Sequence, residues 1–183
     1  MDLKDKRALI TGGTSGMGSA AALSIAKKGA AVIITGRDET RGASTVEEIR
    51  AGGHDAQFIA GDFSEMSEVG RVADAAGEID VLVNAAGFAA RGPTADTDEA
   101  AFDGLFEINV KAPCFLVAAL APKIAARGGG SIINVSTMVA GYGSRAWLPT
   151  ARRGRRSSCS PRPGLPNTGR RTSASTRSLP VRR

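Results

Sequence analysis

The sequence predicts an α/β protein built on an open, doubly wound parallel sheet of about five strands, with a basic C-terminal tail. Short, mainly apolar segments alternate with segments whose apolar residues recur at helical spacing, and a glycine-rich turn follows the first of them. Strands this apolar are covered on both faces, which is typical of parallel sheets with helical crossovers. The composition changes near Ser144. We therefore expect a folded domain over 1–144 and a tail over 145–183.

Apolar runs and capping residues define the elements of the first part. The expected strands are 7–11, 31–35, 56–60, 79–84 and 131–136. The expected helices are 16–28 (ended by Gly29), 38–51 (capped by Asp38 and ended by Gly52), 64–76 (capped by Ser64) and a long one over about 98–127. No internal repeat is evident.

The tail carries all of the excess positive charge. The net charge of +6 is the sum of two unlike parts. Residues 1–144 hold 13 Lys and Arg against 18 Asp and Glu, a net of −5, and residues 145–183 hold 11 Arg and no acid, a net of +11. With five prolines and no apolar period, this Arg-, Pro- and Ser-rich segment is expected to be disordered. Nonspecific nucleic-acid binding through its arginines is an alternative function. Trp147 is its only aromatic residue and no known module is present, so specific nucleic-acid recognition is not expected.

Composition also bears on the compartment. No continuous apolar run has the roughly 18 residues of a membrane helix, and residues 1–6 lack the apolar core of a signal peptide. Cys114 and Cys159 have neither the number nor the spacing of a disulfide framework or a zinc site. These observations predict a cytoplasmic protein with no membrane partner and no metal.

The glycine-rich turn is a candidate phosphate-binding loop. It reads Thr11-Gly-Gly-Thr-Ser-Gly-Met-Gly18, between a strand and a helix. Glycines let a backbone approach a pyrophosphate closely, and a helix N-terminus offers free N–H groups and a positive dipole end. The spacing is G-x-x-x-G-x-G rather than G-x-G-x-x-G, and an ordinary tight turn is the alternative. The candidate residues are Gly12, Thr14, Ser15, Gly16, Met17 and Gly18.

Two strand ends carry candidates for the adenosine half of a dinucleotide. At the end of the second strand, Gly36 takes the place of the acid that would bind the ribose of NAD, and Arg37 follows. Arg37 could meet a 2′-phosphate, which favours NADP(H) over NAD(H), unless it is a solvated loop arginine. After the third strand, Asp62 and Phe63 could contact adenine, with a helix-entry acid as an equal alternative.

The fourth and fifth strands end in further candidates. The fourth is followed by small residues that let the chain pass close to a cofactor, in the segment Asn84, Ala85, Ala86 and Gly87. Asn109 lies inside the long helix, where asparagine is unfavourable, so a special role is plausible. Ser136 and Thr137 place hydroxyls at the carboxyl end of the fifth strand, which faces the ligand crevice of such sheets.

Together, TGGTSGMG at 11–18, VNAAG at 83–87, IN at 108–109 and NVST at 134–137 give residues 1–144 a specific resemblance to the short-chain dehydrogenase/reductase family. The resemblance implies a Rossmann-type NADP(H)-binding domain and hydride transfer between NADP(H) and an alcohol or carbonyl substrate. It also implies homo-oligomers formed through the long helix and the next one. It assigns Asn109 to the family's catalytic Asn and Thr137, preceded by Ser136, to its Ser.

The resemblance also implies a Tyr and a Lys, spaced as Y-x-x-x-K, and this chain lacks both. Their positions fall on Thr150 and Gly154, and no lysine follows Lys123. Tyr142 is the only tyrosine and has Ala146 at its +4 position, so it is expected to be a loop residue. Catalytic activity is therefore expected to be lost, and a non-catalytic NADP(H)-binding protein is the alternative function.

A change of reading frame accounts for the missing pair. In the shifted frame, each codon consists of the last base of one present codon and the first two bases of the next. Read in this way, the segment RAWLPT at 145–150 can become PGMAAY, which places Tyr at the family's spacing. Further residues then read as an amphipathic helix, although Gly154 can become Arg, Gly or Trp but never Lys. We therefore expect a frameshifted or mispredicted, and hence truncated, reductase. The substrate and the oligomeric state are not specified by the sequence, and assembly is doubtful because the second interface helix would come from the tail.

Overall fold

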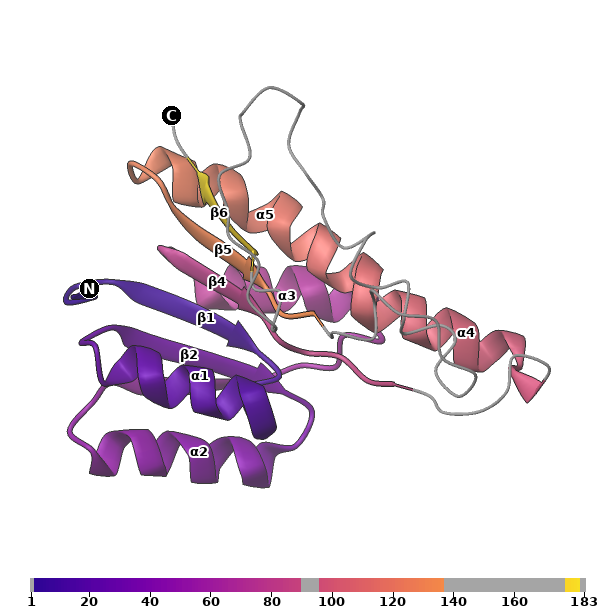
Figure 1. Ribbon diagram of the computed structural model, residues 1–183, viewed down its shortest axis with the longest axis horizontal. Coiled ribbons are helices and arrows are strands. Elements are labelled where there is room, and N and C mark those ends of the chain that lie inside the picture. Colours follow the sequence, from indigo (N-terminus) through magenta and orange to yellow (C-terminus); the bar gives the residue numbers. More distant parts are fainter. Residues whose placement is uncertain (1, 90–95, 137–176, 182–183) are drawn as a thin grey trace.

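The computed structural model describes residues 2–89 and 96–136 and, as backbone only, 177–181 (Figure 1). Most of the tail and Thr137 therefore lie outside the described residues.

The core of the fold is a parallel sheet with helices on both faces (Figure 1). Five parallel strands were expected, and they are present: β1 (Arg7–Thr11), β2 (Ala31–Gly36), β3 (Ala56–Ala60), β4 (Val81–Asn84) and β5 (Gly130–Asn134). The sheet order is β3-β2-β1-β4-β5-β6. The chain thus runs outward from β1 to β3 and then returns to the other side of β1. The direction of winding reverses between β1 and β4, where sheets of this kind bind ligands.

The helices cover the two faces in pairs because residues of alternate parity along each strand point to opposite sides. α1 (Gly16–Ala26) and α2 (Glu39–Ala51) pack on the face that presents Ile10 and Ile34. α3 (Met66–Ala76) and α5 (Ala112–Ala126) pack on the face that presents Leu9 and Ile33. The sheet is therefore buried on both faces, as its apolar strands predicted.

Local capping agrees with the sequence at one helix and differs at another. Asp38 caps α2, since its carboxylate accepts a hydrogen bond from the Arg41 N–H at 2.9 Å. α3 begins at Met66, after Glu65, so the prediction that Ser64 caps this helix is wrong. The Ser64 N–H and hydroxyl instead donate to Asp62 Oδ1, at 3.0 and 2.8 Å. The carboxylate directly upstream is the stronger acceptor for both donors.

The long helix expected over about 98–127 is one helical stretch with a π turn in its middle. α4 (Glu99–Phe106) leads into the π turn η2 (Glu107–Lys111), which continues as α5. Pro113 has no N–H to donate to the carbonyl of Asn109 four residues earlier, which removes one α-type bond at this point. The turn sets Asn109 at the point where the helix changes its winding.

By length and composition, the stretch Glu99–Ala126 could cross a membrane, which differs from the expectation drawn from continuous apolar runs. Leu105, Leu116, Leu120 and Ile124 of this stretch are buried in the fold. The core helix of a soluble protein has the same length and composition, so this feature is weak evidence for a membrane.

A sixth strand, β6 (Arg177–Val181), pairs antiparallel with β5 at the edge of the sheet. The sequence analysis did not predict it, because residues 177–181 contain a proline and lie in a segment without apolar period. An edge position tolerates proline, and the outer edge of β5, which β4 does not cover, offers backbone groups with which another strand can pair.

Candidate functional site

The candidate site lies at the carboxyl ends of β1 and β4, where the sheet changes its direction of winding. Thr11 closes β1, and its buried hydroxyl oxygen accepts hydrogen bonds from the N–H groups of Ala85 at 3.1 Å and Ala86 at 3.0 Å. One side chain thus joins the glycine-rich loop to the segment after β4. Thr11 was not among the predicted site residues, although its place as the last strand residue before a glycine was a usable signal.

The loop after β1 is packed so closely that it requires glycine. Gly12 has φ +66°, and a Cβ there would lie 2.7 Å from Ala86 Cα. A Cβ on Gly18 would overlap the carbonyl of Gly12, so α1 can begin under the loop only with glycine at this position. Gly16 has φ +56° and open space around it. Gly12 and Gly18 therefore allow the turn to pack closely, whereas Gly16 leaves the outer surface of the turn free of side chains.

The N-terminus of α1 is uncapped by its own side chains. Ser15 occupies the N-cap position without a side-chain hydrogen bond within the described residues, and no acid lies in the first turn. Ser15, Gly16 and Met17 are exposed, and Met17 retains 70% of its surface. Free N–H groups and the positive end of the helix dipole are the elements that hold a phosphate. This arrangement fits the pyrophosphate of a dinucleotide.

The ends of β2 and β3 bring Arg37 and Asp62 together. Arg37 Nη1 lies 4.0 Å from Asp62 Oδ2, and their side chains are 67% and 40% exposed. A side chain at position 36 would displace the side chain of Thr14, because a Cβ there would lie 2.7 Å from the Thr14 methyl group. The ribose acid of NAD-binding sheets is absent from this position, which leaves Arg37 as the charged residue directly after β2.

Phe63 differs from the other residues predicted at this rim. Its side chain is 5% exposed and packs in the core beside Val69 and Val72 of α3. Phe63 could therefore offer a ligand only its backbone. An aromatic residue at the entry of a helix that covers the sheet is a core residue by position, and this signal was available in the sequence.

An asparagine pair joins the ends of β4 and β5. Asn84 is buried, and its Nδ2 donates to Asn134 Oδ1 at 2.9 Å. The Oδ1 of Asn84 has no hydrogen-bond partner among the described residues. The half-buried Ser136 follows Asn134 by two residues at the same edge. Asn84 is thus a buried polar group at the crevice, whereas Asn134 is a contributor that the list of predicted site residues did not include.

Asn109 anchors the segment that follows Gly87. Its Nδ2 donates to the Phe88 carbonyl at 2.9 Å and its Oδ1 accepts from the Phe88 N–H at 3.2 Å. Asn109 is 3% exposed, so both bonds are sheltered from solvent. The special role expected of this asparagine is, in the structure, to hold a backbone segment. Of the other expected catalytic residues, Thr137 lies outside the described residues, as do Tyr142, Thr150 and Gly154.

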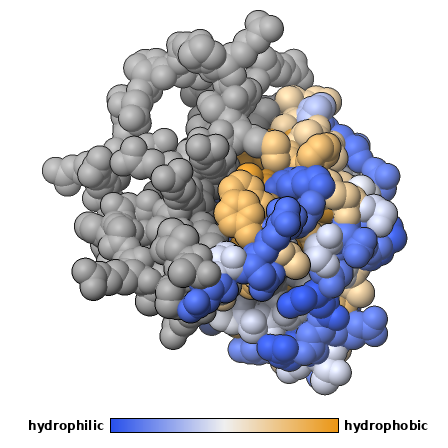
Figure 2. Space-filling model, turned by 90° about the vertical axis from the view of Figure 1, so that its right-hand side faces the viewer, coloured by the Kyte–Doolittle hydropathy of each residue, from blue (hydrophilic) through white to orange (hydrophobic). Residues whose placement is uncertain are grey.

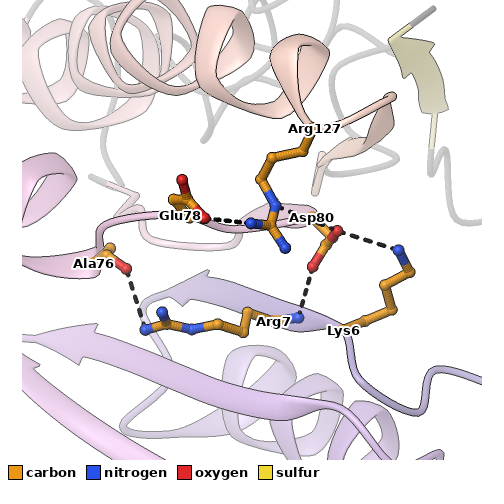
Figure 3. A network of polar contacts seen from close by, with 6 residues as sticks. All are labelled: Lys6, Arg7, Ala76, Glu78, Asp80 and Arg127. Atoms are coloured by element: carbon orange, nitrogen blue, oxygen red, sulfur yellow. Dashed lines mark hydrogen bonds and ion pairs between the residues drawn. The ribbon is translucent and has the colours of Figure 1, made fainter.

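A polar network occupies the opposite end of the sheet (Figure 3). Asp80 accepts hydrogen bonds from the Arg7 N–H at 3.0 Å and from Lys6 Nζ at 3.2 Å, and Arg127 Nε lies 3.8 Å from it. Burial is the largest single effect and raises the pKa of Asp80. The two hydrogen bonds and the charges of Lys6 and Arg127 together outweigh burial, so this pKa lies below its ordinary value. These residues join the start of β1 to β4 and to the end of α5, away from the candidate site.

An open parallel sheet with a glycine-rich loop at the reversal of its winding defines a protein of the Rossmann type. A sequence model described as short chain dehydrogenase matches residues 6–149. An uncharacterized oxidoreductase of Thermotoga maritima is 39% identical over 139 residues, which are 75% of this chain and 55% of that protein. The chain belongs to the short-chain dehydrogenase family.

Solved structures agree with this assignment. A short chain dehydrogenase/reductase family protein has a TM-score of 0.79 and 41% identity, over 84% of this chain and 64% of the other. A blue fluorescent protein from a metagenomic library, in complex with NADPH, has a TM-score of 0.77 and 29% identity, over 85% and 66%. The chain spans about half the length of the curated relatives that it matches.

Proposed function

We propose that this chain binds NADP(H) at the carboxyl ends of its central strands and binds NAD(H) less well. The observation that carries the proposal is the pair Gly36–Arg37: the first position has no acidic side chain, and the second presents an exposed guanidinium. Arginine suits a phosphate because its planar donors match the phosphate oxygens. The NADPH bound by a structural relative supports a nicotinamide cofactor.

In this proposal, the parts of the site have separate roles. The N–H groups at the start of α1 (Gly16, Met17 and Gly18) hold the pyrophosphate, with Gly12, Thr14 and Ser15 shaping the loop. Asp62 faces the adenine, with Phe63 contributing its backbone. Thr11 and Asn109 hold the segment Asn84–Gly87 and Phe88 in place, so that the chain passes close to the cofactor without filling its space.

The proposed ancestral reaction is oxidoreduction between a small-molecule alcohol and its carbonyl form. The bound nicotinamide would accept or supply the hydride. Ser136 and Thr137 would orient the substrate oxygen by hydrogen bonding. A general acid or base must then move the proton on that oxygen, and proton transfer by such a group contributes about 10²–10⁴-fold to the rate. This chain has Thr150 and Gly154 at the family's Tyr and Lys positions, so we propose that turnover is largely lost.

Fluorescence titration of the full chain with NADPH and NADH tests cofactor binding. We expect saturable binding of both, tighter for NADPH, and loss of the NADPH preference in Arg37→Ala. Tighter binding of NADH by the unchanged chain would refute the proposed preference. A ketone panel assayed for NADPH consumption tests the loss of turnover, and rates close to those of ordinary reductases would contradict it.

A non-catalytic cofactor-binding protein is the second candidate function. The glycine-rich loop and Arg37 support it, because both are present in the described domain, whereas the family's Tyr and Lys are replaced by Thr150 and Gly154. Binding without turnover distinguishes it from an active enzyme. Nucleic-acid binding through the arginine tail is a less favoured alternative, and loss of selective nucleic-acid binding on deletion of 145–183 would support it.

We further propose that the tail arises from a change of reading frame. The match to the family model ends at residue 149, close to the change in composition after Ser144. The DNA across codons 143–150 tests the idea. An intact single frame, together with a peptide from 145–183 found by mass spectrometry, would refute it.

The long helical stretch carries exposed aromatic side chains. Phe102, Phe106 and Phe115 of this stretch are exposed, and hydrophobic surface lies beside hydrophilic surface on the face seen in Figure 2. We propose that this helix contributes to homo-oligomers, as the family resemblance implies, and that this chain assembles poorly if its second interface helix is missing. Light scattering after size-exclusion chromatography tests this point. A cytoplasmic location is proposed from the composition.

A further inference from the structure

Arg37 and Asp62, at the ends of β2 and β3, form the rim of the site at which the adenosine half of the cofactor is proposed to bind. The backbone fixes the geometry of this rim. Gly36 pairs with Ala60 in the sheet register, and the Gly61 N–H donates to the Gly36 carbonyl at 3.0 Å. Arg37 and Asp62 each follow this joined pair by one residue. Their side chains are therefore brought together by the backbone of two neighbouring strands.

Ser64 determines which oxygen of Asp62 faces Arg37. The Ser64 N–H and hydroxyl both donate to Oδ1, at 3.0 and 2.8 Å. Oδ2 is the oxygen that lies 4.0 Å from Arg37 Nη1. The carboxylate thus presents its less occupied oxygen, and a full negative charge, to the guanidinium.

The contact between Arg37 and Asp62 is electrostatic rather than a hydrogen bond. A separation of 4.0 Å exceeds hydrogen-bond range, and both side chains are substantially exposed. Asp62 therefore does not lock Arg37 in one orientation, so it preorganises the guanidinium little. What Asp62 contributes is a charge that offsets the charge of Arg37.

Neighbouring arginines do not restore a positive field at this rim. Arg71 reaches the Ala60 carbonyl, but Glu68 binds its guanidinium at 2.7 and 2.6 Å. Arg41 is paired with Asp38 at 2.6 Å. Among the described residues around the rim, each of the three guanidinium groups thus has an acid beside it.

We propose that Asp62 is a specificity-determining residue that weakens the preference of this site for a 2′-phosphate. The proposal rests on the proposed function of the site as a dinucleotide-binding crevice. A 2′-phosphate attracted by Arg37 is repelled by Asp62 at the same rim, whereas the 2′-hydroxyl of NAD(H) is not. The site therefore favours NADP(H) by a small factor and also accepts NAD(H).

Calorimetric titration of the full chain with 2′,5′-ADP and with AMP isolates this effect, because the two ligands differ only in the 2′-phosphate. Asp62→Asn removes the charge and retains an acceptor for Ser64. We expect this variant to raise the affinity for 2′,5′-ADP relative to AMP about two- to fivefold at low salt, and less at high salt. Glu47→Gln is the matched control. It removes an equal charge from an exposed position of α2, two turns away from the rim, and should change the ratio less than about 1.5-fold.

Arg37→Gln is a second test variant, and it leaves the hydrogen bonds between Ser64 and Asp62 unchanged. With the cation removed, the remaining charge of Asp62 should make 2′,5′-ADP bind more weakly than AMP. A 2′,5′-ADP affinity equal to or above that of AMP in this variant would overturn the proposal. So would an unchanged or lower ratio in Asp62→Asn, including equal weakening of both ligands. If the unchanged chain binds neither ligand, the proposed function itself fails, which distinguishes the two failures.

Discussion

Asn109 and Phe88 form a closed pair of hydrogen bonds between a side-chain amide and a backbone amide 21 residues apart. The amide of Asn109 stands at the π turn of the long helix, and the segment that it holds follows directly from Gly87. The helical stretch and the loop of the candidate site are thus connected through one buried side chain.

Replacement of Asn109 should destabilise the fold. Asn109→Ala leaves the Phe88 N–H and carbonyl without this partner, and we expect a loss of about 1–3 kcal/mol in the free energy of unfolding. Urea denaturation followed by circular dichroism measures the change. Lys111→Ala, which removes an exposed ion pair in the same turn, should cost less than about 1 kcal/mol. Equal effects of the two substitutions would contradict the structural role of Asn109.

The hydroxyl of Thr11 should matter more than its methyl group. Thr11→Val keeps the shape but removes the acceptor for two backbone N–H groups, and should cost about 1–3 kcal/mol in urea denaturation. Thr11→Ser retains the acceptor and should lie closer to the unchanged chain. A smaller loss for valine than for serine would show that packing, rather than hydrogen bonding, determines this position.

Glycine should be required at position 18 and dispensable at position 70. Gly18→Ala places a methyl group on the carbonyl of Gly12, so we expect weaker cofactor binding and a lower melting temperature. Gly70 lies in α3 with no atom near its would-be Cβ. Gly70→Ala should therefore stabilise the chain by about 0.5–1 kcal/mol through helix propensity. A Gly18→Ala chain with unchanged stability and affinity would refute the close packing of the loop.

The carboxylate of Asp80 should make stability dependent on pH on the acid side. Its pKa in the folded chain lies below the ordinary value of 3.8, so its contribution is present above that value. The contribution is lost as the pH falls through the folded-state pKa, because the unfolded chain takes up the proton first. Asp80→Asn should lower stability near neutral pH and flatten the acid limb of a plot of unfolding free energy against pH. An acid limb as steep as in the unchanged chain would exclude this role.

Sequence reasoning predicted well where the signal is local. Each parallel strand is a run of apolar residues, and the five runs give the five parallel strands within a few residues at their ends. Asp38 was identified as a helix cap from its residue type and its position before the helix, and its partner, the Arg41 N–H, is only three residues away. The glycine-rich loop was identified because a strand and a helix flank it directly.

Prediction failed where the hydrogen-bond partner of a residue is distant in the sequence, or where two nearby groups compete for the same side chain. Nothing near Asn109 in the sequence indicates Phe88, because folding of the intervening chain brings them together. Ser64 had two possible roles, and the upstream carboxylate of Asp62 outcompetes the helix start. The edge strand β6 depends on an available partner in β5 rather than on a strong strand signal of its own.

The polar network around Asp80 and the candidate site lie at opposite ends of the same strands. A change at one end is separated from the other by the length of the sheet, so most effects at the two ends should add independently. The scaffold is therefore modular in an engineering sense. The exposed side chains after β2 and β3, Arg37 and Asp62, can be varied to select a new ligand, while the network of Lys6, Asp80 and Arg127 holds the other end of the sheet together.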